Sequence, residues 1–374
     1  MEAEVIRKHF GTIEDPRFKP FVEHKLSDIL IMVMCAVMCG LDEPESILEY
    51  ANEKRAFLRE TFGIEKIPSK STLQRVLNIV NGEIVAECVC DIMSETLGTD
   101  GDIIALDGKA VCSCESDYAE QKVRIVSAFI TKTGVVLGQR TIPEKTNEIP
   151  VVRELLSMFN IDGKIITADA LHCQRDTVEL IINCGGDYVI GLKGNQGIMH
   201  EEIKLYMEDC ENDPAIQLEK YSTIEKNKDR IERRICTKSP TLDWFEDKDK
   251  WAGLKTAISV RRIVTTKEKV TDETSYYISS LDVSAERFNE IIREHWLIES
   301  MHYQLDVTFG EDNGRVMSAN GNISLNAFRK LALAKHRIFD KFLEAKKRFS
   351  AKTSMLKALL NPLRLISILK FKFP

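Results

Sequence analysis

Short apolar runs rich in β-branched residues alternate with helical stretches in the middle of this 374-residue chain. Three strand-like runs come first, and a helix, a strand, a second helix and a last strand follow them. This order predicts an α/β fold with a mixed sheet, because tight turns favour antiparallel neighbours and helical crossovers favour parallel ones. The expected strands are IIALD (103–107), VRIVSAFI (123–130), VVLGQRTI (135–142), KIITAD (164–169) and DYVIGLK (187–193), and the expected helices are 149–159 and 173–184.

The segments on either side of this region differ from it and from each other. The order of strands and helices in the middle region is that of the RNase H-like fold, so we expect an RNase H-like mixed-sheet catalytic core there. A helical N-terminal domain precedes this core, and a β-rich insertion interrupts it. The expected boundaries are 1–97 for the helical N-terminal domain, 98–199 for the first part of the core, 200–283 for the insertion, 284–340 for the second part of the core and 341–374 for a basic C-terminal tail.

Several elements are expected outside the first part of the core. In the N-terminal domain, apolar spacing predicts one helix from Lys25 to Leu41 and another from Glu45 to Phe62, opened by Pro44. In the insertion, residues 223–238, 256–270 and 273–281 are predicted as antiparallel strands. A long helix is expected over 285–305.

Three acidic residues stand where such a fold can use them. Asp107 and Asp169 each close an expected buried strand, and Glu299 lies in the helical pattern IREHWLIESMH (292–302). Strands end at the rim of a sheet, so the two aspartates can converge there, and a helical glutamate can add a third carboxylate. Two hard divalent cations held by carboxylate oxygens can activate an attacking oxygen and stabilise a leaving one. Asp107, Asp169 and Glu299 are therefore the predicted catalytic and metal-binding residues.

The spacing around Glu299 predicts how its helix is used. Glu299 shares one helical face with four other residues, and an apolar stripe lies beside that face. We therefore expect the stripe to hold Glu299 at the boundary between core and solvent. The face is Ile292, His295, Glu299, His302 and Asp306, and the stripe is Ile291, Ile298 and Leu305.

Charge and composition limit the classes of protein that the chain can belong to. The net charge is −6, yet the stretch from Arg329 to Lys372 has 13 basic and 2 acidic residues. That stretch can follow a phosphate backbone, or it can be a solvated amphipathic helix. The longest apolar run (29–41) has 13 residues, fewer than the roughly 20 of a membrane helix, so we read it as a buried helix.

The ten cysteines come without an export signal, which favours free thiols and a cytoplasmic protein with no membrane contact. Cys88 and Cys90, like Cys112 and Cys114, are separated by one residue, which does not match structural zinc sites.

A possible DNA-reading element follows the turn at Pro68 and Ser69. Ser69 is a suitable N-cap, and polar residues including Arg75 follow on one face of a short helix. A short helix after a tight turn is typical of a helix-turn-helix recognition element. A plain surface helix is the alternative.

Other residues are candidates for contacts with a nucleic-acid backbone. Four polar residues follow strand ends close to the acids, where they can bind phosphate or simply form turns. They are Lys109, Lys193, Asn195 and Gln196. Arg230 and Arg234 alternate with Glu232 on an expected strand, so they form either a DNA-facing patch or a surface ion-pair ladder. Trp296 can stack on a base or pack in the core.

Several phrases together resemble the DDE transposases of bacterial insertion sequences, in the subgroup of the H-repeat-associated proteins. They are, in chain order, DPRFKPFVEHKLSDIL, IALDGK, GQRTIPEKTNEIP, TADALHCQ, GGDYVIGLKGNQ and IREHWLIESMHYQLDVTFGEDNGR. The resemblance covers nearly the whole chain. By this resemblance Asp107 and Asp169 match the two family aspartates, and Glu299 matches the glutamate. His295 takes a position at which the wider family has arginine, and it is a further candidate for contact with phosphate.

The resemblance implies an RNase H-like core and a dependence on Mg²⁺ or Mn²⁺, with two ions expected. It implies DNA transposition, in which double-stranded DNA is cleaved at the terminal inverted repeats of an element and transferred to target DNA. A homodimer on paired ends is the expected assembly. The alternative function is that of a catalytically impaired or domesticated DNA-binding relic of a transposase, and the presence of all three acids favours the active enzyme.

Overall fold

The computed structural model describes residues 2–111, 123–144, 146–227, 229–314, 316, 318–343 and 349–372. The chain forms two compact units. The first, called the helical unit here, comprises Met1–Asp100, Gly108–Val151 and Glu299–Pro374. The second, called the sheet unit, comprises Gly101–Asp107 and Val152–Ile298. Strand β1 (Ile103–Val111) and helix α10 (Ala285–Phe309) each contribute residues to both units.

Parallel strands form the centre of the sheet unit. β1 pairs in parallel with β4 (Ile165–Ala168), and β4 pairs in parallel with β5 (Asp187–Leu192). Parallel neighbours need a crossover connection, and helix α8 (Arg175–Asn183) provides it between β4 and β5. Helix α7 (Glu148–Leu156) lies in the connection that leads to β4. Because these strands have helices on their faces, their sequences are almost continuously apolar.

The strand order confirms the predicted mixed sheet. β2 (Val123–Ile130) and β3 (Val136–Thr141) form an antiparallel hairpin, and the complete order is β3-β2-β1-β4-β5-β9-β8-β7-β6. The first five strands thus have the order of the RNase H-like fold, with a parallel group beside an antiparallel hairpin. The fold class predicted from the order of elements is correct.

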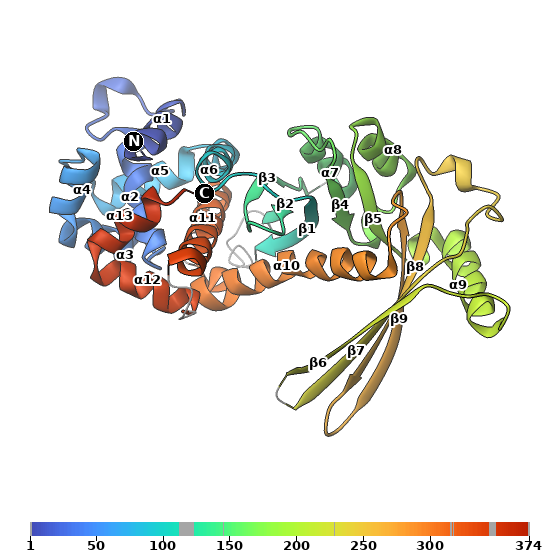
Figure 1. Ribbon diagram of the computed structural model, residues 1–374. Helices are drawn as coiled ribbons and strands as arrows, with labels where there is room; N and C mark the ends of the chain where they lie inside the picture. The colour runs from blue at the N-terminus through green and yellow to red at the C-terminus, as the bar shows by residue number, and fades with distance from the viewer. Residues whose placement is uncertain are drawn as a thin grey trace. The chain divides into compact units, whose positions relative to one another are not determined.

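The predicted insertion extends this sheet. β9 (Val270–Ser279) pairs antiparallel with β5, and three further strands follow it in antiparallel order. They are β6 (Lys220–Asn227), β7 (Arg230–Lys238) and β8 (Thr256–Thr265). In Figure 1 the ends of these four strands project from the sheet as a long antiparallel arm, and helix α9 (Gly197–Asn212) lies near its base.

The first half of α10 covers one face of the sheet unit. Phe288, Ile291 and Ile292 pack in one cluster with strand residues that include Ile103 and Val189. Phe288 and Ile291 are fully buried, so this half of the helix is fixed to β1 and β5 by apolar contact. The packing explains why a long helix forms here, since its apolar face supplies most of the stabilisation.

The helical unit joins the two ends of the chain. Helix α11 (Ala319–Leu343) packs against α6 (Gly82–Leu97), α5 (Lys70–Ile79) and α2 (Leu26–Met38). Figure 1 shows these helices gathered in one unit, with the C-terminal helices beside the N-terminal ones. Further helices of the unit are α1 (Glu2–Gly11), α3 (Pro44–Glu53), α4 (Arg55–Phe62), α12 (Ala351–Leu360) and α13 (Pro362–Lys370).

The apolar run at residues 29–41 is a buried helix, as predicted. Eleven residues of α2 are buried, so this helix belongs to the core of the helical unit. Among the described residues, no helix is both long and apolar enough to cross a membrane. Cys88 and Cys90 are buried free thiols on α6, whereas Cys112 and Cys114 lie outside the described residues.

The structure corrects three expectations about individual elements. The helix predicted over Glu45–Phe62 is two helices, α3 and α4, separated at Lys54, where no glycine or proline marks a break. The single strand predicted over 223–238 is a hairpin of β6 and β7. The start of the predicted β-rich insertion is helix α9, whose buried positions are Met199, Ile203, Met207 and Cys210. That helical spacing is present in the sequence but is masked by the acidic residues between its members.

Replacing Phe288 by alanine should lower the free energy of unfolding by about 3–5 kcal/mol, because the side chain is fully buried between α10 and the sheet. The measurement is urea denaturation followed by circular dichroism. Ile198→Ala is the control, since Ile198 is 80% exposed and its truncation should change stability little. Equal losses for the two variants would contradict the packing described above.

Candidate functional site

The two aspartates follow neighbouring parallel strands at the same level. Ile103 pairs with Ile165, and Ala105 pairs with Thr167. If the same pairing is continued two residues beyond Ala105 and Thr167, Asp107 lies opposite Asp169. Neighbouring strands lie about 4.8 Å apart, so this register brings the two carboxylates close together at one edge of the sheet.

Both aspartates belong to the sheet face that α10 covers. Side chains alternate along a strand, so Asp107 shares a face with Ile103, and Asp169 shares a face with Thr167. Ile103 packs in the cluster with α10. The carboxylates therefore continue the α10-covered face beyond the point where the apolar packing ends. Asp169 is exposed and Asp107 is partly buried.

His295 lies on α10 within reach of both carboxylates. Its Nδ1 is 3.0 Å from Oγ1 of Thr167, a contact that fixes the orientation of the ring. Burial lowers the pKa of His295, while the negative charges of Asp107 and Asp169 act in the opposite direction. His295 therefore connects the helix to the strand ends at the level of the two aspartates.

Asp169 also shapes the turn that follows β4. Its carboxylate accepts a hydrogen bond from the backbone N–H of Leu171 at 3.1 Å and caps the short 3₁₀ helix Ala170–His172. Nε2 of His172, a residue only 1% exposed, lies 3.9 Å from Oδ1 of Asp169. The capping bond holds the carboxylate near the strand end, while half of the side chain remains accessible to solvent.

Two of the predicted DNA contacts support this turn. The side-chain amide of Asn195 donates to the carbonyl of Ala170 at 2.6 Å, and that of Gln196 donates to the carbonyl of Cys173 at 2.9 Å. Gly191 packs closely against the same turn, because a Cβ there would lie 3.1 Å from the backbone nitrogen of Ala170. The structure thus assigns the two amide side chains a bracing role that sequence reasoning missed.

Glu299 follows His295 by one turn of α10 and is exposed to solvent. The predicted apolar stripe beside it is confirmed, because Ile291, Ile298 and Leu305 are all completely buried. Trp296 is 45% exposed, so it is not a core residue. Glu299 thus lies at the boundary between core and solvent, as its spacing predicted.

The donor chemistry of the strand ends fits a hard divalent cation, since carboxylate oxygens are the ligands that Mg²⁺ and Mn²⁺ prefer. Among the residues that the structure describes, no three histidine, cysteine, aspartate or glutamate side chains are grouped closely enough to hold a metal ion. The metal ligands predicted from the sequence therefore stay a prediction.

Two protein families match consecutive parts of the chain. The family described as DDE_Tnp_1-associated matches residues 7–93, and the family described as Transposase DDE domain matches residues 98–334. The second match covers more than half of the sequence. The chain belongs to the DDE transposase family.

Relatives agree with this assignment over almost the whole length. The H repeat-associated putative transposase YhhI of Escherichia coli K12 is 35% identical, over 94% of this chain and 96% of its own. The putative transposase YncI of Escherichia coli O157:H7 is 34% identical, over 89% of this chain and 87% of its own.

A cryo-EM structure of the piggyBac transposase synaptic complex with hairpin DNA aligns with 99% of this chain and 78% of its own, at 12% identity and a TM-score of 0.42.

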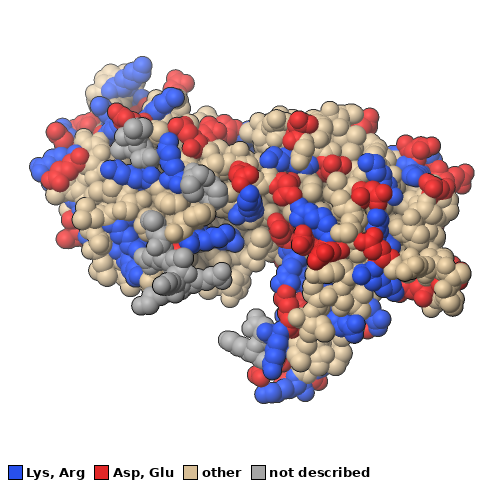
Figure 2. Space-filling view, in the orientation of Figure 1, with Lys and Arg blue, Asp and Glu red and all other residues tan. Residues whose placement is uncertain are grey.

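The arginines of the β6–β9 arm form an ion-pair ladder, one of the two alternatives for them. Glu232 accepts hydrogen bonds from Arg234 at 2.6 Å and Arg262 at 3.0 Å, and it also pairs with Arg230. Burial acts to raise the pKa of Glu232, but the three arginines outweigh it and lower that pKa to about 2. Figure 2 shows basic and acidic side chains interspersed along the arm.

The short helix predicted after the turn at Pro68 and Ser69 forms as α5. Oγ of Ser69 accepts a hydrogen bond from the backbone N–H of Thr72 and caps α5. Arg75 is exposed on this helix, while Leu73 and Val76 are buried on the opposite side. Lys193 is likewise exposed after β5. These two cations have the accessibility that a phosphate or base contact requires.

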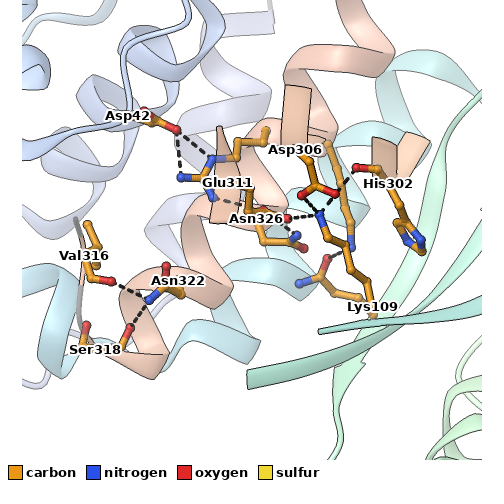
Figure 3. Close-up of polar contacts among 12 residues, drawn as sticks. Asp42, Lys109, His302, Asp306, Glu311, Val316, Ser318, Asn322 and Asn326 are labelled. Carbon is orange, nitrogen blue, oxygen red and sulfur yellow. Dashed lines mark hydrogen bonds and ion pairs between the residues drawn. The ribbon is translucent and has the colours of Figure 1, made fainter. Parts of the chain in front are cut away.

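Lys109 lies in a buried ionic cluster that the sequence did not reveal (Figure 3). Its ammonium donates to Glu311 at 2.9 Å and also pairs with Asp306. Glu311 is completely buried and accepts further hydrogen bonds from Arg329 at 3.0 Å and Asn326 at 2.9 Å. Burial acts to raise the pKa of Glu311, but Arg329, Lys109 and Asn326 lower it to about 2. Lys109 is therefore bound within the protein, where sequence reasoning had assigned it to DNA.

Glu311 stands in the phrase FGEDNGR, which carried the family resemblance without any role for this residue. No periodic pattern marks it, because it follows the end of α10 and its partners come from β1 and α11. Burying a carboxylate without cations beside it costs a large free energy, so Glu311 needs its cationic partners. Both its burial and these partners become visible only in the folded chain.

Replacing Glu311 by glutamine should lower the free energy of unfolding at neutral pH by about 3–5 kcal/mol, because it leaves two buried cations without their shared counter-charge. The wild-type chain should lose this contribution as the pH falls from about 4.5 towards about 2, since the folded-state pKa of Glu311 lies below its ordinary value. Urea denaturation at a series of pH values measures both effects.

The matched control is Glu60→Gln, because Glu60 belongs to the same unit and is 73% exposed at its side chain. It should unfold like the wild type at every pH. If Glu311→Gln kept the wild-type stability and the wild-type acid dependence, the buried cluster would not contribute to stability as described.

Proposed function

We propose that this member of the DDE transposase family is an active enzyme that cuts DNA and transfers strands at the ends of an insertion sequence. The observation that carries the proposal is the register of β1 and β4, which pairs Ala105 with Thr167 and, continued by two residues, sets Asp107 opposite Asp169. The family match supports it, because this family is defined by a transposase DDE domain and its match includes Glu299.

Asp107, Asp169 and Glu299 would hold Mg²⁺ or Mn²⁺, and two ions are proposed. Bound ions would supply the activation of an attacking hydroxyl and the stabilisation of the leaving oxygen. His295 would orient this arrangement, because its bond to Thr167 fixes the turn of α10 that precedes Glu299. Asn195 and Gln196 would keep the Asp169 turn in place while DNA is bound.

The substrate proposed is double-stranded DNA that carries the terminal inverted repeats of the element, followed by target DNA. Exposed cations support contacts with its backbone, namely Lys193 near the strand ends and Arg75 on the capped helix α5. Two ends must be joined together in transposition, so we propose a homodimer that binds one end on each copy. The relatives named as putative transposases are consistent with this substrate.

Asp107→Asn, Asp169→Asn and Glu299→Gln should each reduce Mg²⁺-dependent cleavage of terminal-repeat DNA by more than about 100-fold. Each change removes one charge with little change in volume, and the loss should exceed the 10–100-fold typical of residues that only support a metal ligand. Cleavage is measured on labelled DNA, and binding is measured by mobility shift in the same buffer. Binding should stay within about threefold of wild type, because the phosphate contacts lie elsewhere.

Asp176→Asn is the control, because Asp176 lies in the sheet unit with Asp107 and Asp169 and has a 73% exposed side chain that pairs with Arg153. If one of the three acid variants cleaved DNA at the wild-type rate, the replaced residue would not be part of the active site. A wild-type chain that binds the repeats without cleaving them would support the alternative of a DNA-binding relic.

Arg75→Ala should weaken binding to the terminal repeat by about 1–3 kcal/mol if the arginine contacts a base edge, and its affinity for random DNA should change less. Competition binding with specific and random duplexes measures the difference. Arg55→Ala is the control, because Arg55 is an exposed arginine of the neighbouring helix α4. Equal losses on both duplexes would show that Arg75 contacts only phosphate, and no loss on either would exclude α5 as the recognition helix.

A further inference from the structure

The Lys109 ammonium is surrounded by acceptors of the protein itself. It donates to Oε2 of Glu311 at 2.9 Å, approaches the carbonyl oxygen of His302 at 3.5 Å and pairs with the Asp306 carboxylate. A lysine ammonium has three N–H donors, so these three acceptors can use all of them. Only 11% of the side chain is exposed. In Figure 3 the Lys109 side chain points into this group of residues from strand β1.

The far side of the same cluster is fixed to the helices of the helical unit. Glu311 binds Arg329 and Asn326, both on α11, and Arg329 donates from Nε to Asp42 at 2.8 Å. Arg329 is 1% exposed and Asp42 is 14% exposed at the side chain. A continuous chain of charge-assisted hydrogen bonds therefore runs from the segment after α2, through α11, to Lys109 on β1.

Lys109 follows Asp107 by two residues on the same strand, so the two side chains share one face. The residue between them, Gly108, lies close to another side chain. A Cβ at Gly108 would lie 2.6 Å from a carboxylate oxygen of Glu148, the first residue of α7. The Asp-Gly-Lys segment is thus held by the Lys109 cluster on one face and approached closely by Glu148 on the other.

From this arrangement we propose that Lys109 is a positioning residue for Asp107. Its ion pairs to Asp306 and Glu311 fix the end of β1, and through the backbone they fix the place of the Asp107 carboxylate. The inference rests on the proposed function, in which Asp107 holds a metal ion. A metal ligand must be held within about 0.5 Å of its working position, and a lysine anchored to a buried carboxylate can provide that restraint.

The competing role for Lys109 is the phosphate contact expected from the sequence. To reach a phosphate, the ammonium would have to leave Glu311, which is completely buried and would lose one of its two cationic partners. Lys193, which is exposed, requires no such separation. The two lysines therefore offer a direct comparison between positioning and DNA contact.

The test compares Lys109→Met with Lys193→Met in the full chain. Dissociation constants for Mn²⁺ are measured without DNA by electron paramagnetic resonance, and the Mn²⁺ concentration for half-maximal cleavage is measured with terminal-repeat DNA. Lys109→Met should raise both values about 10–100-fold, as expected when a residue that supports a ligand is lost. DNA affinity and its dependence on salt should remain at the wild-type values. Lys193→Met should show the reverse pattern, with unchanged Mn²⁺ affinity and a salt slope reduced by about 1.

Asp306→Asn provides a second variant in case Lys109→Met does not fold. It removes the more exposed partner of Lys109, 34% exposed at its side chain, and leaves the Glu311 contact in place. It should raise the Mn²⁺ dissociation constant in the same direction by a smaller factor. Lys132→Met, at an exposed lysine paired with Asp100, is the neutral control.

Unchanged Mn²⁺ affinity in both Lys109→Met and Asp306→Asn would overturn the proposal, as would a loss of DNA affinity with a reduced salt slope in Lys109→Met. Failure of the proposed function has a different signature. In that case the wild-type chain itself would bind no Mn²⁺ through Asp107, shown by equal dissociation constants for wild type and Asp107→Asn.

Discussion

The parallel pairing of β1 with β4 is the constraint on which the candidate site depends. The pairing joins segments that are about sixty residues apart in the chain, and its register puts Asp107 opposite Asp169. A shift of one residue would turn one of the two carboxylates to the opposite face of the sheet. The register is fixed by burial, because Ile103 on β1 and Val189 on β5 pack in the same cluster against α10.

Helix α10 extends this constraint to the rest of the site. Its first half is held to the sheet by Phe288 and Ile291, and His295 is bonded to Thr167 beside the strand ends. The turn carrying Asp169 is secured separately by Asn195 and Gln196. Apolar packing thus sets the position of the secondary-structure elements, and a small number of directional hydrogen bonds sets the position of the side chains at their ends.

Elements with a strong periodic pattern were predictable from the sequence. The strands from Val123 to Leu192 and the apolar stripe of α10 follow from alternating or helical spacing, and the structure confirms them. The break at Lys54 was not predictable, because no glycine or proline there disfavours a helix. Helix α9 was missed because its buried stripe is diluted by acidic residues.

The roles of polar side chains also divide into those that the sequence predicts and those that only the folded structure shows. The sequence by itself predicted which residues could hold a metal, since aspartates at two strand ends and a glutamate in a helix are visible as a pattern. Only the tertiary structure decided that Lys109 binds Glu311 and Asp306, and that Asn195 and Gln196 bind backbone carbonyls. The physical reason is that a buried charge or amide must find a partner, and that partner comes from whichever distant segment the fold brings near.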